Sequence, residues 1–182
     1  MKSLAVLISG TGTNLQAIIA AIGAGKIPAR IATVIADRGC AGSQHALHNH
    51  INFQLIDRQL SDFPEQLTAA VPPVDLVVLA GFLSLVSTAL VARFPKRIIN
   101  LHPSLLPLFK GAHAIKESFD SDMKVGGVSV HWVSEELDGG KIIAQRAFKK
   151  SAGMSFETYE AKIHEIEHEL LPQVIVEILC QS

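Results

Sequence analysis

Two hydrogen-bonding side chains, Asn100 and His102, stand one residue apart in the stretch NLHPSLLP. The apolar run RII before them is typical of the end of a buried strand, and side chains alternate faces along a strand. We therefore expect Asn100 and His102 to point the same way, with Leu101 pointing into the fold. An amide and an imidazole aimed at one point can donate hydrogen bonds or move a proton. A lone histidine is more often a satisfied, half-buried residue, but the neighbouring asparagine and the proline-stiffened turn favour function.

A second candidate is the glycine-rich stretch SGTGTNLQ, residues 9–16, which follows one apolar run and leads into a helical pattern. Glycines allow a tight turn, and the free amides at a helix N-terminus bind phosphate. A dinucleotide fingerprint would need glycine where Leu15 stands, although the acidic Asp37 lies near the end of the next run. The stretch predicts a monophosphate site better than a dinucleotide site, and an ordinary strand-to-helix turn explains it equally well.

Two further groups of polar residues lie in the C-terminal half of the chain. Asp138 belongs to ELDGGKII, residues 136–143, where Asp-Gly is also a strong hairpin signal. On a predicted C-terminal helix, His164, Glu167 and His168 are spaced so that they share one face. That stripe faces either a ligand or, as the default for charged residues, the solvent.

The stretch LAGFLSLVS, residues 79–87, is the apolar counterpart of these polar groups. Its side chains could line a slot for a ring, although such a run more often packs in a core. A histidine cluster at residues 45–50 has no carboxylate or cysteine to complete a ligand set, so we expect no metal site.

The elements that must position these residues alternate along the first 107 residues. Short, continuous apolar runs typical of strands buried on both faces separate helical patterns, which indicates a doubly wound, Rossmann-like α/β fold with a mostly parallel sheet. The strands are expected at 4–8, 31–35, 53–56, 76–79 and 97–101, and the helices at 15–24, 43–50, 61–70 and 87–94.

The pattern changes after Pro107. Residues 125–133 and 141–148 read as two long strands that form an antiparallel pair. A long helix follows over 155–179, with Ser155 as its N-cap and a kink or break at Pro172. At 182 residues the chain fits a single domain.

Composition excludes several classes of protein. The net charge of -1 provides no field that would attract nucleic acid or anionic lipid. Cys40 and Cys180 lie far apart, without zinc or disulfide spacing, so we expect a reduced, cytoplasmic protein. No stretch approaches the roughly 20 apolar residues of a membrane span.

Taken together, SGTGTN, LAGF, NLHPSLLP, SVHWV and ELDGG resemble, in order and over nearly the whole chain, the phosphoribosylglycinamide formyltransferases. That family transfers a formyl group from 10-formyltetrahydrofolate to the amine of glycinamide ribonucleotide (GAR) in purine synthesis. The resemblance implies that Asn100 and His102 stabilise the oxyanion and that Asp138 moves a proton and orients His102, roles that suit their chemistry. It also implies small-molecule substrates, no metal, and a monomer or weak homodimer.

The resemblance further implies two binding regions. The phosphate and ribose of GAR would be bound by Gly12, Thr13, Asn14, His164 and Glu167. The folate would enter a slot formed by Phe82, Leu83, Ser84, Leu85, Val86, Val133, Ser134 and Asp138.

This sequence departs from the family's pattern at two places at the edge of the expected site. Many relatives have arginine where this chain has Ser84, so one folate contact would be lost or made by backbone. The family's Lys-aromatic-Pro-Gly pattern is replaced by residues 108–111, LFKG, at the start of a mobile loop expected over 108–125 that includes His113.

Four other classes of protein are alternatives to this family. A formyltetrahydrofolate hydrolase has an additional regulatory domain, and methionyl-tRNA formyltransferase has a C-terminal RNA-binding domain and a basic surface. A nucleotide-binding oxidoreductase would need the missing third glycine. A non-catalytic module would have no need of Asn100, His102 and Asp138 together.

Overall fold

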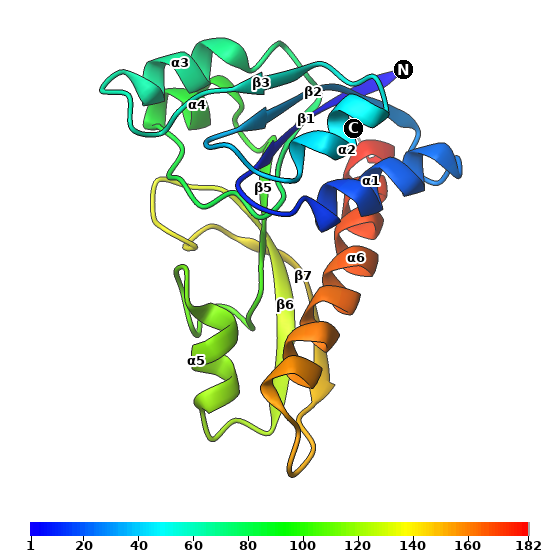
Figure 1. Ribbon diagram of the computed structural model, residues 1–182, viewed down its shortest axis with the longest axis vertical. Coiled ribbons are helices and arrows are strands. Elements are labelled where there is room, and N and C mark those ends of the chain that lie inside the picture. The colour runs from blue at the N-terminus through cyan, green and yellow to red at the C-terminus, as the bar shows by residue number, and fades with distance from the viewer. Residues whose placement is uncertain (182) are drawn as a thin grey trace.

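Residues 1–181, which the computed structural model describes, form seven strands in one sheet and six helices (Figure 1). The strands are β1 (Lys2–Ile8), β2 (Ala29–Ala36), β3 (Phe53–Leu55), β4 (Leu76–Leu79), β5 (Ile98–His102), β6 (Val125–Trp132) and β7 (Ile142–Lys149). The helices are α1 (Thr13–Gly23), α2 (Ser43–His48), α3 (Phe63–Ala70), α4 (Thr88–Arg93), α5 (Ala114–Asp120) and α6 (Phe156–Cys180).

The strand order is β3-β2-β1-β4-β5-β6-β7. Neighbouring strands from β3 to β5 are parallel, whereas β6 is antiparallel to β5 and β7 is antiparallel to β6. The predicted fold class, a mostly parallel sheet with antiparallel C-terminal strands, is therefore confirmed.

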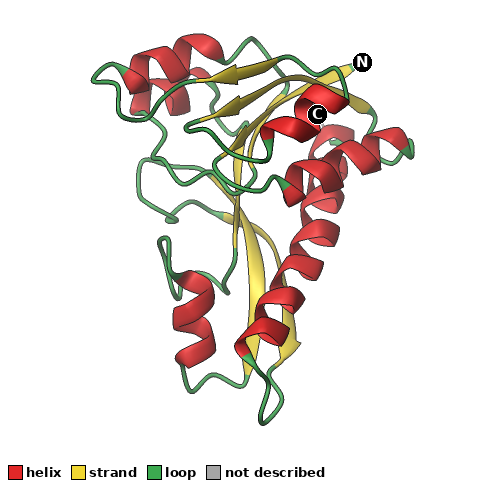
Figure 2. Ribbon diagram, in the orientation of Figure 1, coloured by secondary structure: helices red, strands yellow, loops and turns green. Residues whose placement is uncertain are grey.

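Alternate residues of β1 fill two separate cores. Leu4, Val6 and Ile8 pack on the side covered by α1 and α6, and Ala5 and Leu7 pack on the side covered by α3 and α4. Figure 2 shows helices on both sides of the strands. Because both faces are covered, the strand is apolar throughout, which is why its sequence is a continuous run.

All elements expected from the sequence are present, and their ends lie within two residues of the predicted ones. The break expected at Pro172 is wrong, since α6 continues through this residue. Leu170, Leu171 and Val174 are buried on both sides of the proline, and this packing offsets the lost backbone hydrogen bond.

Helix α5 lies within residues 108–125, which were expected to form a loop. The helix has no side-chain cap at its N-terminus. It is stabilised by tertiary contacts, because its own sequence contains no strong local helix pattern. The buried hydroxyl groups of Ser118 and Tyr159 are 2.6 Å apart, and the Phe119 ring packs edge-on against Phe156 and Tyr159. Lys150 donates hydrogen bonds to the carbonyl groups of Phe119 and Ser121 at the end of the helix. These contacts attach α5 to α6 and to the residue that follows β7.

We expect Gly126→Ala to destabilise the protein by about 1–3 kcal/mol, the usual cost of overpacking. A Cβ added to Gly126 would collide with the hydroxyl and ring of Tyr159, the residue that anchors α5. The free energy of unfolding in urea measures the change. Gly23→Ala is the matched control, because nothing lies within 4 Å of a Cβ there and alanine favours the helix. Equal stability of the two variants would contradict the packing described.

Candidate active site

A cleft of about 740 Å³ opens where the loops after β1, β4 and β5 meet the β6–β7 loop and the cleft-facing sides of α5 and α6. Parallel strands place their carboxyl ends at one edge, where α/β proteins bind ligands. The cleft brings together the residues predicted from the sequence: Gly12, Thr13, Asn14, Phe82, Leu83, Ser84, Leu85, Val86, Asn100, His102, Val133, Ser134, Asp138, His164 and Glu167. His113, at the N-cap of α5, also lines it.

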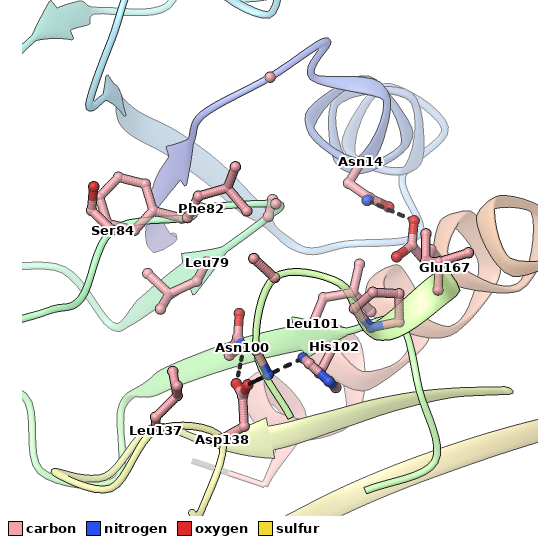
Figure 3. A pocket seen from close by; sticks show the side chains of 18 of the residues that line it. Asn14, Leu79, Phe82, Ser84, Asn100, Leu101, His102, Leu137, Asp138 and Glu167 are labelled. Atoms are coloured by element: carbon pink, nitrogen blue, oxygen red, sulfur yellow. Dashed lines mark hydrogen bonds and ion pairs between the residues drawn. The ribbon is translucent and has the colours of Figure 1, made fainter. Parts of the chain in front are cut away.

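Asn100 and His102 point to the same side of β5 and reach one carboxylate, as the alternation of side chains predicts (Figure 3). Asn100 Nδ2 donates a 3.2 Å hydrogen bond to Asp138 Oδ1, and His102 Nδ1 lies 3.4 Å from Asp138 Oδ2. Leu101 points the other way, into the core that contains α1 and α6. The three residues expected to act together are therefore adjacent in space.

Asp138 is a buried acid whose side chain is only 7% exposed. Burial opposes its ionisation, but the groups around the carboxylate, among them the Gly111 amide and the charge of His102, outweigh burial and lower the Asp138 pKa to about 2. The Gly111 amide donates a 2.9 Å hydrogen bond to Oδ2. Asp138 is thus an acceptor-only carboxylate at neutral pH.

Both ring nitrogens of His102 face acceptors. Nε2 lies 2.8 Å from the Phe109 carbonyl oxygen, so it donates, and Nδ1 faces the Asp138 carboxylate. The ring is therefore held between the Phe109 carbonyl and the Asp138 carboxylate.

The Phe109 carbonyl is held in place by buried hydroxyl groups under the PSLLP turn. Ser104 Oγ donates to the carbonyl oxygens of Leu108 and Phe109, and Ser129 Oγ donates to the Ser104 carbonyl. Gln145 Nε2 donates to Ser129 Oγ and to the Leu106 carbonyl. This network, which the sequence did not reveal, fixes the acceptor of His102.

His131 is a further site residue that the sequence analysis did not single out. It pairs directly with Asn100 in the β5–β6 register, and its Nε2 lies 3.1 Å from Asn100 Nδ2. Its side chain is 2% exposed. Pairing the predicted strands in register would have placed His131 beside Asn100.

At the other end of the cleft, Asn14 and His164 converge on Glu167. Asn14 Nδ2 donates to Glu167 Oε2 at 3.2 Å (Figure 3). His164 Nδ1 lies 2.8 Å from the same oxygen. The hydrogen bond that His164 donates to Glu167 raises the His164 pKa despite partial burial. Gly12 adopts φ 77°, and a Cβ there would lie 2.6 Å from the Gly42 Cα. These residues surround the free amides of the α1 N-terminus, which suit an anion.

His168, the third member of the stripe on α6, does not line the cleft. Its Nε2 is buried and, among residues 1–181, has no hydrogen-bond partner. The stripe is therefore divided between cleft and interior.

The loop after β4 forms the apolar part of the cleft. Phe82 is buried in the core beneath, while Leu83 and Leu85 are 62% and 70% exposed. Ser9 Oγ accepts a hydrogen bond from the Leu83 amide, which fixes the loop backbone.

The hydroxyl of Ser84 donates to Asp37 Oδ2 at 2.5 Å, so it is already engaged. Asp37 is also bound by Arg38 through two hydrogen bonds. Burial opposes its ionisation, but these hydrogen bonds keep its pKa below the ordinary value. Asp37 therefore fixes the loop and is not free to bind a ribose.

Among residues 1–181, no group of three or more histidine, cysteine, aspartate or glutamate side chains has the geometry of a metal site. In the same part of the chain, none of the helices combines the length and apolar character needed to cross a membrane.

The sequence model of the formyl transferase family matches residues 2–175. The chain is similar to phosphoribosylglycinamide formyltransferase of Haemophilus influenzae, with 37% identity over 96% of this chain and 86% of that protein. The crystal structure of phosphoribosylglycinamide formyltransferase from Campylobacter jejuni is 45% identical, covers 98% of this chain and 97% of its own, and has a TM-score of 0.88. That from Bacillus halodurans is 35% identical, covers 98% and 95%, and has a TM-score of 0.93.

We expect Asp138→Asn to lower the free energy of unfolding by about 2 kcal/mol at pH 7, the value of a pKa lowered from 3.8 to about 2. Because the Asp138 pKa is lower in the folded state, ionisation of this group stabilises the fold fully at pH values above its pKa in the unfolded chain. This contribution is lost as the pH falls through its pKa in the folded state. The difference between wild type and variant, measured in urea, should therefore shrink from about pH 4 towards pH 2.

Asparagine suits position 138, because it tolerates the φ of 48° found there. Asp120→Asn is the control, since Asp120 lies in an exposed ion pair with Lys116 and should change stability by less than about 0.5 kcal/mol. A stability difference for Asp138→Asn that does not vary with pH would exclude the buried ionised carboxylate.

Proposed function

The chain belongs to the formyl transferase family, and from that premise we propose that it transfers the formyl group of 10-formyltetrahydrofolate to the amine of GAR. The products are N-formyl-GAR and tetrahydrofolate, and the reaction belongs to de novo purine biosynthesis in the cytoplasm. The similar proteins from three bacteria bear the name of this activity.

The observation that supports this function most strongly is the position of Asn100, His102 and Asp138 between two different binding regions of one cleft. On one side lie the α1 N-terminus and Glu167, which suit a phosphorylated sugar. On the other side lies the apolar loop after β4, which suits a flat ring. A reaction between a ribonucleotide and a folate needs this order of groups.

The residues of each region fit their proposed ligand. Asn14 Oδ1 is buried without a partner among the described residues, so it can accept a hydrogen bond from a hydroxyl or amine of GAR. The free amides of residues 12–14 would bind the phosphate, and Glu167, which lines the cleft, would accept hydrogen bonds from the ribose hydroxyls. Phe82, Leu83, Leu85 and Val86 would contact the folate ring, and backbone groups near Ser134 would bind its polar edge.

The catalytic residues would stabilise the negative charge on the formyl oxygen and would accept the proton of the attacking amine. When bound, 10-formyltetrahydrofolate supplies the formyl carbon and a nitrogen that departs with a proton. Asp138 is an ionised acceptor at neutral pH and would take the proton that the attacking amine loses, directly or through water. His102, which lies beside Asp138, and Asn100 would stabilise the negative charge that develops on the formyl oxygen. One such donor is typically worth about 10²–10³ in rate.

The experiment that tests this function follows the absorbance of deformylated folate released from a 10-formylfolate, with and without GAR. Turnover that requires GAR is expected. Turnover without GAR would indicate a hydrolase, and no turnover in either condition would leave a binding protein.

Glu167→Ala should raise KM for GAR by about 10–100-fold and leave KM for the folate within about threefold, because hydrogen bonds to a charged group are lost only at the ribonucleotide end. Glu165→Ala is the matched control on the same helix. Glu165 pairs with Lys162, is mostly exposed and does not line the cleft. An equal rise of both KM values in Glu167→Ala would contradict its assignment.

A further inference from the structure

The two hydrogens of the Asn100 carboxamide both face acceptors inside the protein. One is donated to Asp138 Oδ1 at 3.2 Å, and the nitrogen also lies 3.1 Å from His131 Nε2. An amide nitrogen has two hydrogens, so this nitrogen has none left for a ligand.

The chemistry of the neighbours fixes this orientation. His131 Nδ1 lies 2.9 Å from the Trp132 carbonyl oxygen, which only accepts, so the ring hydrogen is on Nδ1. With that hydrogen on Nδ1, Nε2 presents its lone pair to Asn100 Nδ2, which lies 3.1 Å away, whereas Asp138 Oδ1 lies 3.6 Å away. Asp138 is ionised and only accepts as well. Two acceptors on one side require the nitrogen of Asn100 to face them.

As a result, the carboxamide oxygen of Asn100 points away from Asp138 and towards the cleft (Figure 3). An oxygen cannot donate a hydrogen bond to a developing oxyanion. The role proposed for Asn100 thus requires the carboxamide to rotate during the reaction, so that its nitrogen and oxygen exchange positions.

Rotating the Asn100 carboxamide by half a turn is unfavourable unless one of its two neighbours gains a proton. With its oxygen inward, Asn100 would face the lone pair of His131 Nε2 and the negative Asp138 Oδ1. One proton on either atom gives the inward oxygen a donor. His131 Nε2 and Asp138 Oδ1 are 3.6 Å apart, so either can hold that proton beside Asn100.

We propose that His131 is a positioning residue that, with Asp138, sets which end of the Asn100 carboxamide faces the cleft. One added proton on this pair turns the amide N–H towards the substrate. The inference rests on the proposed formyl transfer, because the proton comes from the attacking amine. Its N–H bond breaks as its nitrogen bonds to the formyl carbon, and the proton passes to Asp138 or His131. Proton release and stabilisation of the oxyanion are thereby coupled.

The groups that face His131 limit what else could control it. Asp138 is the charged group within reach, and His102 and the Gly111 amide act on it through the other carboxylate oxygen. The register neighbour on β7 is the apolar Ile142. The 2% exposed side chain has little contact with solvent.

Nuclear magnetic resonance of the uniformly ¹⁵N-labelled protein, without ligand at pH 7.5, tests the resting orientation directly. A scalar coupling across the N–H···N hydrogen bond between Asn100 Nδ2 and His131 Nε2 is expected, with His131 Nε2 at the chemical shift of an unprotonated nitrogen. A hydrogen on His131 Nε2, or no coupling, would overturn the proposal. This measurement needs no substrate and does not depend on the proposed function.

Kinetics test the catalytic consequence in the variants His131→Leu and His131→Gln. Leucine removes the acceptor, so kcat should fall about 10–100-fold while both KM values stay within about threefold. Glutamine can offer an acceptor or a donor to Asn100 and should recover at least about tenfold of the lost kcat. A wild-type kcat in His131→Leu, a loss confined to KM, or no recovery in His131→Gln would each contradict the proposal. If wild type shows no transfer at all, formyl transfer itself fails, and the resonance measurement still decides the amide orientation.

Discussion

The buried carboxylate of Asp138 is the group on which the rest of the site depends. An ionised acid that is 7% exposed costs free energy unless hydrogen-bond donors surround it. The donors come from separate parts of the chain: Asn100 and His102 on β5 and the Gly111 amide before α5. Satisfying this one charge therefore brings together β5, the loop before α5 and the β6–β7 loop. The arrangement proposed for catalysis is the same set of contacts that makes the buried charge tolerable.

The sheet topology explains why these parts meet at β5. This strand is parallel to β4 on one side and antiparallel to β6 on the other. Asn100 therefore has Leu79 as its register neighbour, where the apolar loop after β4 begins, and His131 as its opposite neighbour on β6. The change of strand direction therefore places the apolar loop after β4 on one side of Asn100 and the polar His131 on the other.

The sequence was sufficient for features that depend on local periodicity, and insufficient for those that depend on tertiary contacts. Continuous apolar runs predicted the buried strands, and alternation along β5 correctly placed Asn100 and His102 on one side. The helix α5 was missed because buried contacts such as Ser118 with Tyr159 hold it, and no local pattern reports a partner 41 residues away. His131 was missed because its significance arises from the register between two strands. Pro172 misled for a similar reason, since the packing of α6 outweighs a local preference.

The charges of the cleft indicate how an anion can bind to a chain with a net charge of -1. The lining includes Glu135, Glu136, Asp138, Glu160 and Glu167, whereas Lys116 is the one lysine or arginine among the described lining residues, and it pairs with Asp120. A phosphate in this cleft must therefore be bound mainly by uncharged groups, and the backbone amides at the α1 N-terminus supply them without a counter-charge. The hydrogen bond between His164 and Glu167 raises the His164 pKa, which favours the charged form of the ring beside the carboxylate nearest Asn14. The close approach of Gly12 to Gly42 then has a clear physical reason, since a side chain at position 12 would displace the loop whose amides we propose as the phosphate site.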